Sequence, residues 1–396
     1  MISRRTLLAA AGFAAGAMPR TQAEPAPARQ LRAGAVDGAL GYDGTTPGPT
    51  LRVKRGEELR VMLRNDLTEQ TSIHWHGLRV PNAMDGAWPL TQPPVAPGAS
   101  FEYRFRPPDA GTFWYRARSA SQIDRGLHGA LIVEEEHPLD VDRDIVLVMG
   151  LRSAETGGPI HANGKLRPDI PVRSGERLRL RLVNATSNRG LALKLEAHDV
   201  RVMAIDGQPA EPFVARDSRV GIGPGGRLDL FVDLMREGGT TAALLAGPDL
   251  QPIARLVYET GPPARTMARR EPAALPSNLL PERIDLKSAQ RVELSITGPR
   301  PLDSGAPLFS VHRGRPVTLA IRNSSGGPQA LHLHGHHFRL LDRLDDGWKP
   351  YWLDSLVVGE PIERIAFLAD NPGKWLIESR MLERPGSEAA WWFTVT

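Results

Sequence analysis

Two pairs of histidines have the spacing of a metal site. His74 and His76 flank a tryptophan, and His332 and His334 flank a leucine. In a β-strand, residues i and i+2 point to the same face, so each pair aims two imidazoles at one place. Imidazole is a common ligand of copper and zinc, and four imidazoles that converge from two strands could hold such an ion. The alternative is that the four histidines are hydrogen-bonded within a polar interface.

The chain of 396 residues contains no cysteine. Disulfides, thiolate nucleophiles, cysteine-held zinc, iron–sulfur clusters and blue-copper centres are therefore excluded. The formal net charge is +4, and it falls nearly to zero if residues 1–23 are removed with their three arginines. The remaining arginines are spread along the chain, so no basic patch indicates nucleic-acid binding.

The N-terminus predicts export. Arg4 and Arg5 precede a short apolar run, and residues 21–23 offer a cleavage site of small residues. This anatomy is typical of a twin-arginine (Tat) signal peptide, which we predict over residues 1–23. The apolar run is too short to span a bilayer, which takes about 20 residues, and no other stretch is long and apolar enough. The protein is therefore expected in the periplasm, exported in its folded state.

The segments that position the histidines are predicted to be short strands. Alternating segments such as 58–63 recur between glycine and proline turns, with the period of half-buried strands. A pattern of strand, glycine turn, alternating strand and terminal asparagine occurs three times, ending at Asn65, Asn184 and Asn323. Three copies predict an all-β protein of three β-sandwiches joined in part by a linker rich in proline and arginine. The predicted ranges are 33–136, 137–260 and 288–396 for the sandwiches and 261–287 for the linker.

Longer motifs around the histidines resemble the laccase-type multicopper oxidases. The motifs are YDGTTPGPT at 42–50, IHWHGL at 73–78, GTFWY at 111–115, HLHGH at 332–336 and GKWLI at 373–377. The resemblance covers both ends of the chain closely and the middle by pattern alone, and it implies three cupredoxin-like Greek-key domains. Members of that family hold a trinuclear copper cluster between the first and last domains, and a blue copper that takes electrons from the substrate. The chain is also similar to a Tat-exported, copper-free branch that acts in cell division.

Compared with the family's four ligand motifs, this chain keeps four histidines and departs from the pattern elsewhere. By the resemblance, His74 and His332 stand where the single type 2 copper binds, while His76 and His334 belong to the coupled copper pair. The other trinuclear positions hold Arg116, Arg118, Glu378 and Arg380. The blue-copper positions hold Gln329, Ser379 and Arg384, and the axial methionine position holds Ala389.

These departures predict that the chain is not a functional four-copper oxidase. A serine hydroxyl cannot replace the thiolate that binds blue copper and passes its electrons to the cluster. Three guanidiniums and one carboxylate in place of neutral imidazoles add about +2 where copper ions would lie. Unit charges about 4 Å apart repel by about 4 kcal/mol at an effective dielectric of 20, which opposes several ions together.

Three functions remain open on the sequence. The preferred hypothesis is a non-catalytic periplasmic protein, without a cofactor, that binds another protein or a component of the cell envelope. The second is a mononuclear, type 2 copper oxidoreductase that uses one copper ion at the four histidines, with Glu378 as an oxygen ligand. The third is an anion-binding protein that uses the guanidiniums of Arg116, Arg118 and Arg380.

Overall fold

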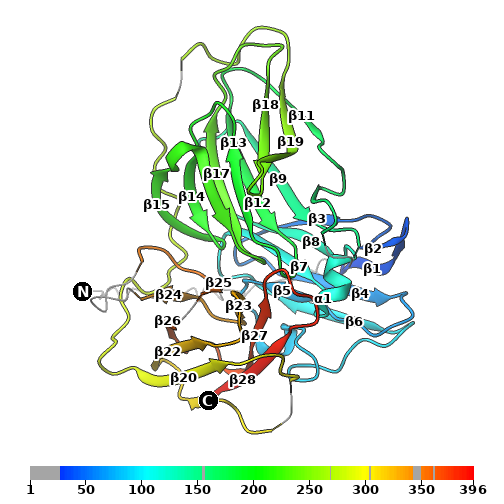
Figure 1. Ribbon diagram of the computed structural model, residues 1–396, viewed down its shortest axis with the longest axis vertical. Coiled ribbons are helices and arrows are strands. Elements are labelled where there is room, and N and C mark those ends of the chain that lie inside the picture. Colours follow the sequence, from blue (N-terminus) through cyan, green and yellow to red (C-terminus); the bar gives the residue numbers. More distant parts are fainter. Residues whose placement is uncertain (1–26, 154–156, 268, 303–304, 342–348, 360–361) are drawn as a thin grey trace, which may run out of the picture.

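A computed structural model describes residues 27–153, 157–267, 269–302, 305–341, 349–359 and 362–396. The predicted signal peptide, residues 1–23, lies outside the described residues. Figure 1 shows three packed β-structures, with the green middle one above a blue–cyan N-terminal one and a yellow–red C-terminal one. The predicted all-β fold is confirmed.

Two four-stranded sheets form the first sandwich. The alternation predicted for the segment 58–63 appears in β4, where Leu59, Val61 and Leu63 are buried. The first strand begins at Arg29, ahead of the predicted start at residue 33, because its first residues pair in parallel with β4. One sheet has the order β2 (Ala39–Tyr42), β1 (Arg29–Val36), β4 (Leu59–Asn65) and β6 (Ser100–Phe105). The other has the order β3 (Gly48–Lys54), β8 (His128–Glu134), β7 (Gly111–Arg116) and β5 (His74–His76).

The middle sandwich has a six-stranded and a five-stranded sheet. Every residue of its central strand β12 is buried, arginines included, because the first sandwich covers the outward face of this sheet. The six-stranded sheet has the order β10 (His161–Ala162), β9 (Arg143–Gly150), β12 (Arg177–Asn184), β17 (Arg227–Asp233), β14 (Arg201–Ile205) and β15 (Gln208–Val214). The five-stranded sheet has the order β11 (Asp169–Val172), β19 (Gln251–Tyr258), β18 (Thr241–Ala246), β13 (Leu191–Leu195) and β16 (Arg219–Ile222).

The third sandwich has a four-stranded and a five-stranded sheet, with Trp375 and Phe393 fully buried in its core. The four-stranded sheet has the order β20 (Gln290–Ile296), β22 (Pro316–Asn323), β26 (Ile362–Leu368) and β24 (Phe338–Leu340). The five-stranded sheet has the order β21 (Ser310–Val311), β28 (Ala389–Val395), β27 (Gly373–Met381), β23 (Gln329–Leu333) and β25 (Ser355–Val358).

The repeated sequence pattern has one structural cause in all three sandwiches. The terminal asparagine of each copy is buried, and its amide group holds the following loop through backbone hydrogen bonds. Asn65, for example, donates to Val95 O at 2.8 Å and accepts from Leu67 N at 3.0 Å. The glycine of each copy has a positive φ, between 78° and 82°, which a side chain would strain. These glycines are Gly56, Gly175 and Gly314.

Helical structure in the described residues is limited to α1 (Ala120–Asp124) and two 3₁₀ turns, η1 (Asn82–Met84) and η2 (Arg216–Ser218). None of these described helices has the length and apolarity that a membrane crossing requires. The predicted linker is packed against the sandwiches, since Leu275, Asn278 and Ile284 are buried. Asn278 also donates to Ala110 O at 2.8 Å, which ties the linker to the first sandwich.

Candidate metal centre

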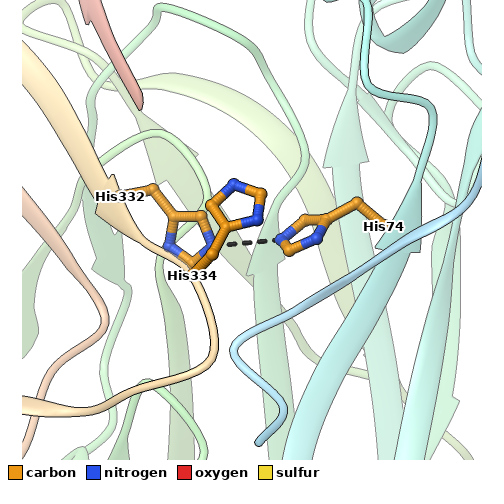
Figure 2. A group of neighbouring side chains, drawn as sticks. All are labelled: His74, His332 and His334. Atoms are coloured by element: carbon orange, nitrogen blue, oxygen red, sulfur yellow. Dashed lines mark hydrogen bonds between the residues drawn. The ribbon is translucent and has the colours of Figure 1, made fainter. Parts of the chain in front are cut away.

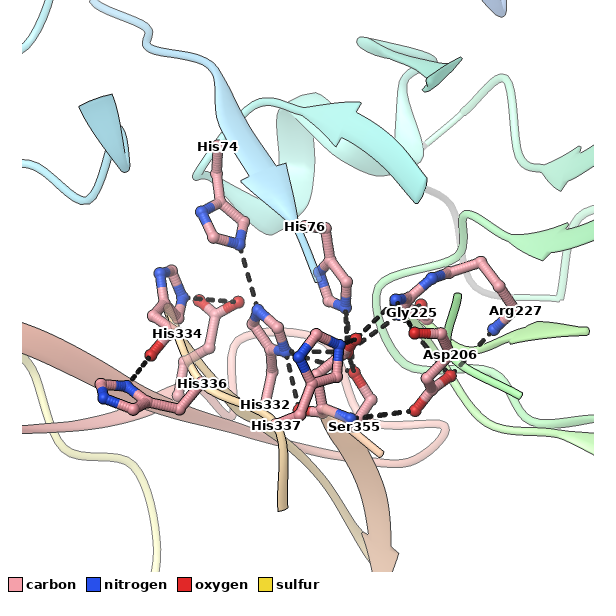
Figure 3. A network of polar contacts seen from close by, with 12 residues as sticks. His74, His76, Asp206, Gly225, Arg227, His332, His334, His336, His337 and Ser355 are labelled. Carbon is pink, nitrogen blue, oxygen red and sulfur yellow. Dashed lines mark hydrogen bonds and ion pairs between the residues drawn. The ribbon is translucent and has the colours of Figure 1, made fainter. Parts of the chain in front are cut away.

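Strands β5 and β23 bring the two histidine pairs together where the first and third sandwiches meet (Figure 3). Within its own sheet, β5 pairs with β7, and β23 pairs with β27. His74, His76, His332 and His334 all have buried side chains, with at most 5% relative exposure. The structure therefore places all four histidines of the sequence prediction in one buried cluster.

His74 and His332 face each other through their Nε2 atoms, which lie 3.1 Å apart (Figure 2). The Nδ1 of His74 lies 2.9 Å from the backbone carbonyl of Asp85, and the Nδ1 of His332 lies 2.9 Å from that of Asp354. Since a carbonyl oxygen only accepts, each Nδ1 carries the ring's proton. Burial lowers the pKa of His74 to about 3 and that of His332 to about 4, so both rings are neutral at pH 7. Two unprotonated nitrogens thus point at each other.

His334 adds a third imidazole beside this pair (Figure 2). Its Nδ1 lies 2.8 Å from Oδ2 of Asp85, whose side chain is fully buried. Its Nε2 makes no hydrogen bond and lies 3.7 Å from Oε1 of Glu378. Burial alone would lower the pKa of His334, but Asp85 and Glu378 outweigh burial and raise the pKa. Ligand nitrogens of His74, His332 and His334 all lie within 4.8 Å of one another, a spacing suited to one shared ion.

His76 has a different environment from the other three histidines. The Nε of Arg116 donates to its Nδ1 at 3.2 Å, and burial lowers the pKa of His76 well below its usual value. The neutral ring therefore carries its proton on Nε2, which donates to Ser355 Oγ at 2.9 Å. The Ser355 hydroxyl in turn lies 2.8 Å from Oδ1 of Asp354. Both ring nitrogens of His76 are thus occupied by protein partners, and Figure 3 shows the contact on the Ser355 side.

Two of the three arginines of the sequence prediction, Arg116 and Arg380, lie next to the histidines and share one carboxylate. Arg116 Nη2 donates to Glu378 Oε1, and Arg380 Nη2 donates to Glu378 Oε2 at 3.1 Å. Burial would raise the pKa of Glu378, but the charges of Arg116 and Arg380 lower it well below its usual value. Arg118 instead lies over Trp88, with its guanidinium carbon 5.2 Å from the ring centroid.

Comparison with known proteins decides the family. Three family models described as multicopper oxidase match residues 28–138, 114–240 and 276–396. The solved structure of Lac15 from a marine microbial metagenome is 33% identical, with a TM-score of 0.82 over 93% of this chain and all of that one. The chain belongs to the multicopper oxidase superfamily. The multi-copper oxidase of Pseudomonas thermotolerans is 29% identical, with a TM-score of 0.83 over 93% of this chain and 99% of its own. Multicopper oxidase MmcO of Mycobacterium tuberculosis is 27% identical over 89% of this chain and 82% of its own length.

Of the residues expected, from the resemblance, at the blue-copper positions, Gln329 and Ser379 form an ordinary polar contact. Ser379 Oγ donates to Gln329 Oε1 at 2.9 Å, and Gln329 Nε2 donates to Ser325 Oγ at 2.7 Å. Arg384 is exposed in the turn that follows β27, and Ala389 is buried at the start of β28. The structure therefore brings Gln329 and Ser379 into contact with each other and leaves Arg384 at the surface.

A buried network of ion pairs and hydrogen bonds contacts Asp354, the residue that binds His332 Nδ1, and joins all three sandwiches (Figure 3). Arg227 of the middle sandwich donates to the two carboxylate oxygens of Asp354 at 2.8 and 2.5 Å. It also donates to the carbonyl of Thr112 in the first sandwich at 3.2 Å. Asp206 accepts from the backbone N–H groups of Asp354 and Ser355, each at 3.2 Å. Because the Asp354 carbonyl accepts from His332, this network fixes the orientation of that imidazole.

Proposed function

We propose that this superfamily member binds a single copper ion between His74, His332 and His334 and does not reduce oxygen at a four-copper centre. One observation carries the proposal: the Nε2 atoms of His74 and His332 face each other at 3.1 Å, while each Nδ1 lies 2.9 Å from a backbone carbonyl and so holds the ring's proton. Two buried lone pairs in contact repel and leave two acceptors unsatisfied, which costs about 1–3 kcal/mol per group. A cation shared by both nitrogens removes this cost.

The donor set fits one ion. Imidazole nitrogens bind a zinc-type ion at about 2.0 Å, so two of them on one tetrahedral ion stand roughly 3.3 Å apart. The separation of 3.1 Å between His74 and His332 is close to that value, and His334 Nε2 is a third buried nitrogen without a hydrogen bond. Copper binds such a nitrogen site more tightly than the other divalent first-row metals do. A copper ion held there supplies one-electron chemistry when bound.

The residues do not fit the rest of a four-copper centre. The chain has no thiolate, and the groups at the blue-copper positions, Ser379 and Gln329, are hydrogen-bonded to each other. We also leave His76 out of the ligand set that the sequence predicted, because Arg116 donates to its Nδ1 and its Nε2 carries the proton. Arg116 and Arg380 project where the family places further imidazoles, and a guanidinium has no lone pair to offer.

The local charge opposes several ions much more than it opposes one. The net charge of about +2 expected from the sequence counted three guanidiniums and one carboxylate, Glu378. The structure adds Asp85, a second buried carboxylate at the site. One net positive charge therefore remains beside the histidines instead of two. At about 4 Å and an effective dielectric of 20, each unit charge on an ion is opposed by about 4 kcal/mol. A divalent ion is thus opposed by about 8 kcal/mol, and each further ion adds the same opposition together with repulsion between the ions.

A metal-free binding role is the second candidate, and the Arg116–Glu378–Arg380 contacts support it, because they satisfy these buried charges without an ion. In that role the protein acts in the periplasm after Tat export by binding a protein or envelope component, as in the copper-free cell-division branch. Anion binding at Arg116, Arg118 and Arg380 has less support. Two of these guanidiniums are bonded to Glu378, and the cavity beside them, about 20 Å³, holds a single water-sized particle.

Copper uptake by the mature chain separates these functions. After equilibrium dialysis against Cu(II), we expect one copper per chain and a type 2 EPR spectrum. His74→Gln and His332→Gln should each abolish this uptake, whereas His312→Gln, at an exposed histidine of the third sandwich, should retain it. Circular dichroism establishes that each variant is folded. A folded wild-type chain that retains no copper would overturn the proposal and favour the metal-free role.

A further inference from the structure

The outward face of the four-stranded sheet in the third sandwich carries a hollow of about 510 Å³. Strands β20, β22 and β26 turn Val317, Leu319 and Ile321 and their neighbours into the core, so the alternate residues point outward. The hollow shares no lining residue with the candidate metal centre, although the segment that carries His332 and His334 lies between its lining residues in the sequence. Its size is in the range of small-ligand sites, which run from about 300 to 1,000 Å³.

Small side chains at the centre of this face create the hollow. Thr318 and Ala320 point outward from the central strand β22, opposite Ala366 and Arg364 of β26. On the other side, Arg291 of β20 lies opposite Thr318. Long side chains on the flanking strands therefore surround a floor of short ones. Leu286, Leu341 and Ile362 add an apolar wall.

The rim of the hollow is strongly cationic. It carries Lys287, Arg291, Arg322 and Arg364 against a single carboxylate, Glu293. In the described part of the chain, Lys287, Arg291 and Arg364 form no ion pair, and Arg322 meets Glu293 only at 3.8 Å. Since the whole chain has a formal charge of only +4, this face holds a large share of its excess positive charge. Unpaired guanidiniums that surround a hollow are suited to a multiply charged oxyanion.

A second hollow of similar size shows that arginine content alone does not make such a site. It measures about 490 Å³ in the middle sandwich and is lined by four arginines. Three of them are already paired: Arg177 with Asp233, Arg201 with Glu271, and Arg269 with carboxylates of the same region. Most of the arginines of that hollow are thus paired within the protein, whereas only Arg322 of the four basic residues on the third sandwich makes an ion pair in the described part of the chain.

We propose that the hollow formed by Lys287, Arg291, Arg322 and Arg364 binds the phosphate group of a ligand that also has an apolar part. The guanidiniums and the ammonium take the phosphate oxygens, and the apolar part packs against Leu286, Leu341 and Ile362. A phospholipid headgroup of the envelope and a soluble phosphate ester share this chemistry. The proposal is independent of copper binding, because the two sites share no residue.

Binding to two probes tests this site at constant ionic strength. The first probe is a vesicle of phosphatidylglycerol, with phosphatidylcholine vesicles as the uncharged reference, and binding is measured by co-sedimentation. The second is hexyl phosphate, a soluble phosphate ester with an apolar chain, measured by titration calorimetry. The test variant is Arg291→Gln/Arg364→Gln, and the matched control is Arg216→Gln/Arg219→Gln, two exposed arginines of the middle sandwich. Both variants lose two positive charges from exposed positions, and both should keep the copper uptake of the wild type.

The wild type should bind at least one probe, and the test variant should bind it about 30-fold more weakly while the control variant binds normally. This factor corresponds to about 1 kcal/mol for each basic residue near an anionic surface. Binding to phosphatidylglycerol vesicles identifies the ligand as a lipid headgroup, and binding to hexyl phosphate alone identifies a soluble ester. Failure of the wild type to bind either probe would overturn the proposal. Equal weakening in both variants would also overturn it, since the attraction would then be a property of net charge.

Discussion

Replacement of Glu378 by glutamine removes the carboxylate that Arg116 and Arg380 share. The side chains of Arg116 and Glu378 are 1% and 8% exposed, so the arginine would keep its charge without access to water. Loss of one partner of a buried ion pair costs about 3–5 kcal/mol. We expect a free energy of unfolding lower by an amount in the upper half of that range, because Arg380 and His334 lose the same partner.

Urea unfolding followed by tryptophan fluorescence measures this loss, with Glu211→Gln at an exposed position as the control. The effect should depend on pH in a defined direction. Burial raises the pKa of Glu378, but Arg116 and Arg380 outweigh burial and lower the pKa below the ordinary value of 4.5. The stabilisation is therefore complete at pH 7 and is lost as the pH falls from 4.5 towards the lowered pKa. A Glu378→Gln variant within about 1 kcal/mol of the wild type at pH 7 would refute this reasoning, as would a difference that stays constant in acid.

Three further predictions concern the metal centre and its support. Asp85 and Glu378 outweigh burial and raise the pKa of His334 above 6.5, so protons compete with copper for this imidazole. Equilibrium dialysis should therefore show weaker copper binding at pH 6 than at pH 9. A copper affinity that does not depend on pH would contradict a role for His334. Arg227→Met should lower the free energy of unfolding by about 3–5 kcal/mol, because it breaks a buried ion pair where the three sandwiches meet, and it should speed limited proteolysis. Arg255→Met, at an exposed ion pair, should do neither. Unchanged protease resistance of Arg227→Met would show that the network does not hold the sandwiches together. The copper-loaded protein should show no intense blue absorption, because the chain has no thiolate to bind the metal. With a phenolic reductant in an oxygen electrode it should consume no oxygen, because no thiolate carries electrons from the substrate to the metal. Sustained oxygen consumption that His332→Gln abolishes would show that another electron route exists.

Local sequence patterns were sufficient to predict the fold and the convergence of the histidines. Strand alternation depends on which residues are buried, and the glycine and asparagine of each repeat have a local conformational or loop-binding role. The convergence of each His-x-His pair could be predicted because residues i and i+2 lie on the same face of a strand, whatever the strand packs against. The first strand begins at Arg29, ahead of the range 33–136 predicted for the first sandwich, because its first residues pair with β4.

Residues that act through packing between sandwiches carried no local signal. Asp85 follows a 3₁₀ turn, yet it is buried against His334, which lies 249 residues further along the chain. Arg227 and Asp206 come from the middle sandwich and act on Asp354 of the third. The tautomer of His76 could not be predicted either, since it depends on the donor Arg116 in the neighbouring strand. The spacing of the histidines thus identified them as candidate metal ligands. Only the tertiary structure showed which of them have a ring nitrogen free to bind a metal.

X-ray absorption at the copper edge of the dialysed protein tests the central claim most directly, because it counts and identifies the ligands. We predict one copper per chain, bound by three imidazole nitrogens, with a reduced imidazole count in His334→Gln. A spectrum with a short copper–copper distance, or a stoichiometry of two or more coppers per chain, would contradict the single site at His74, His332 and His334.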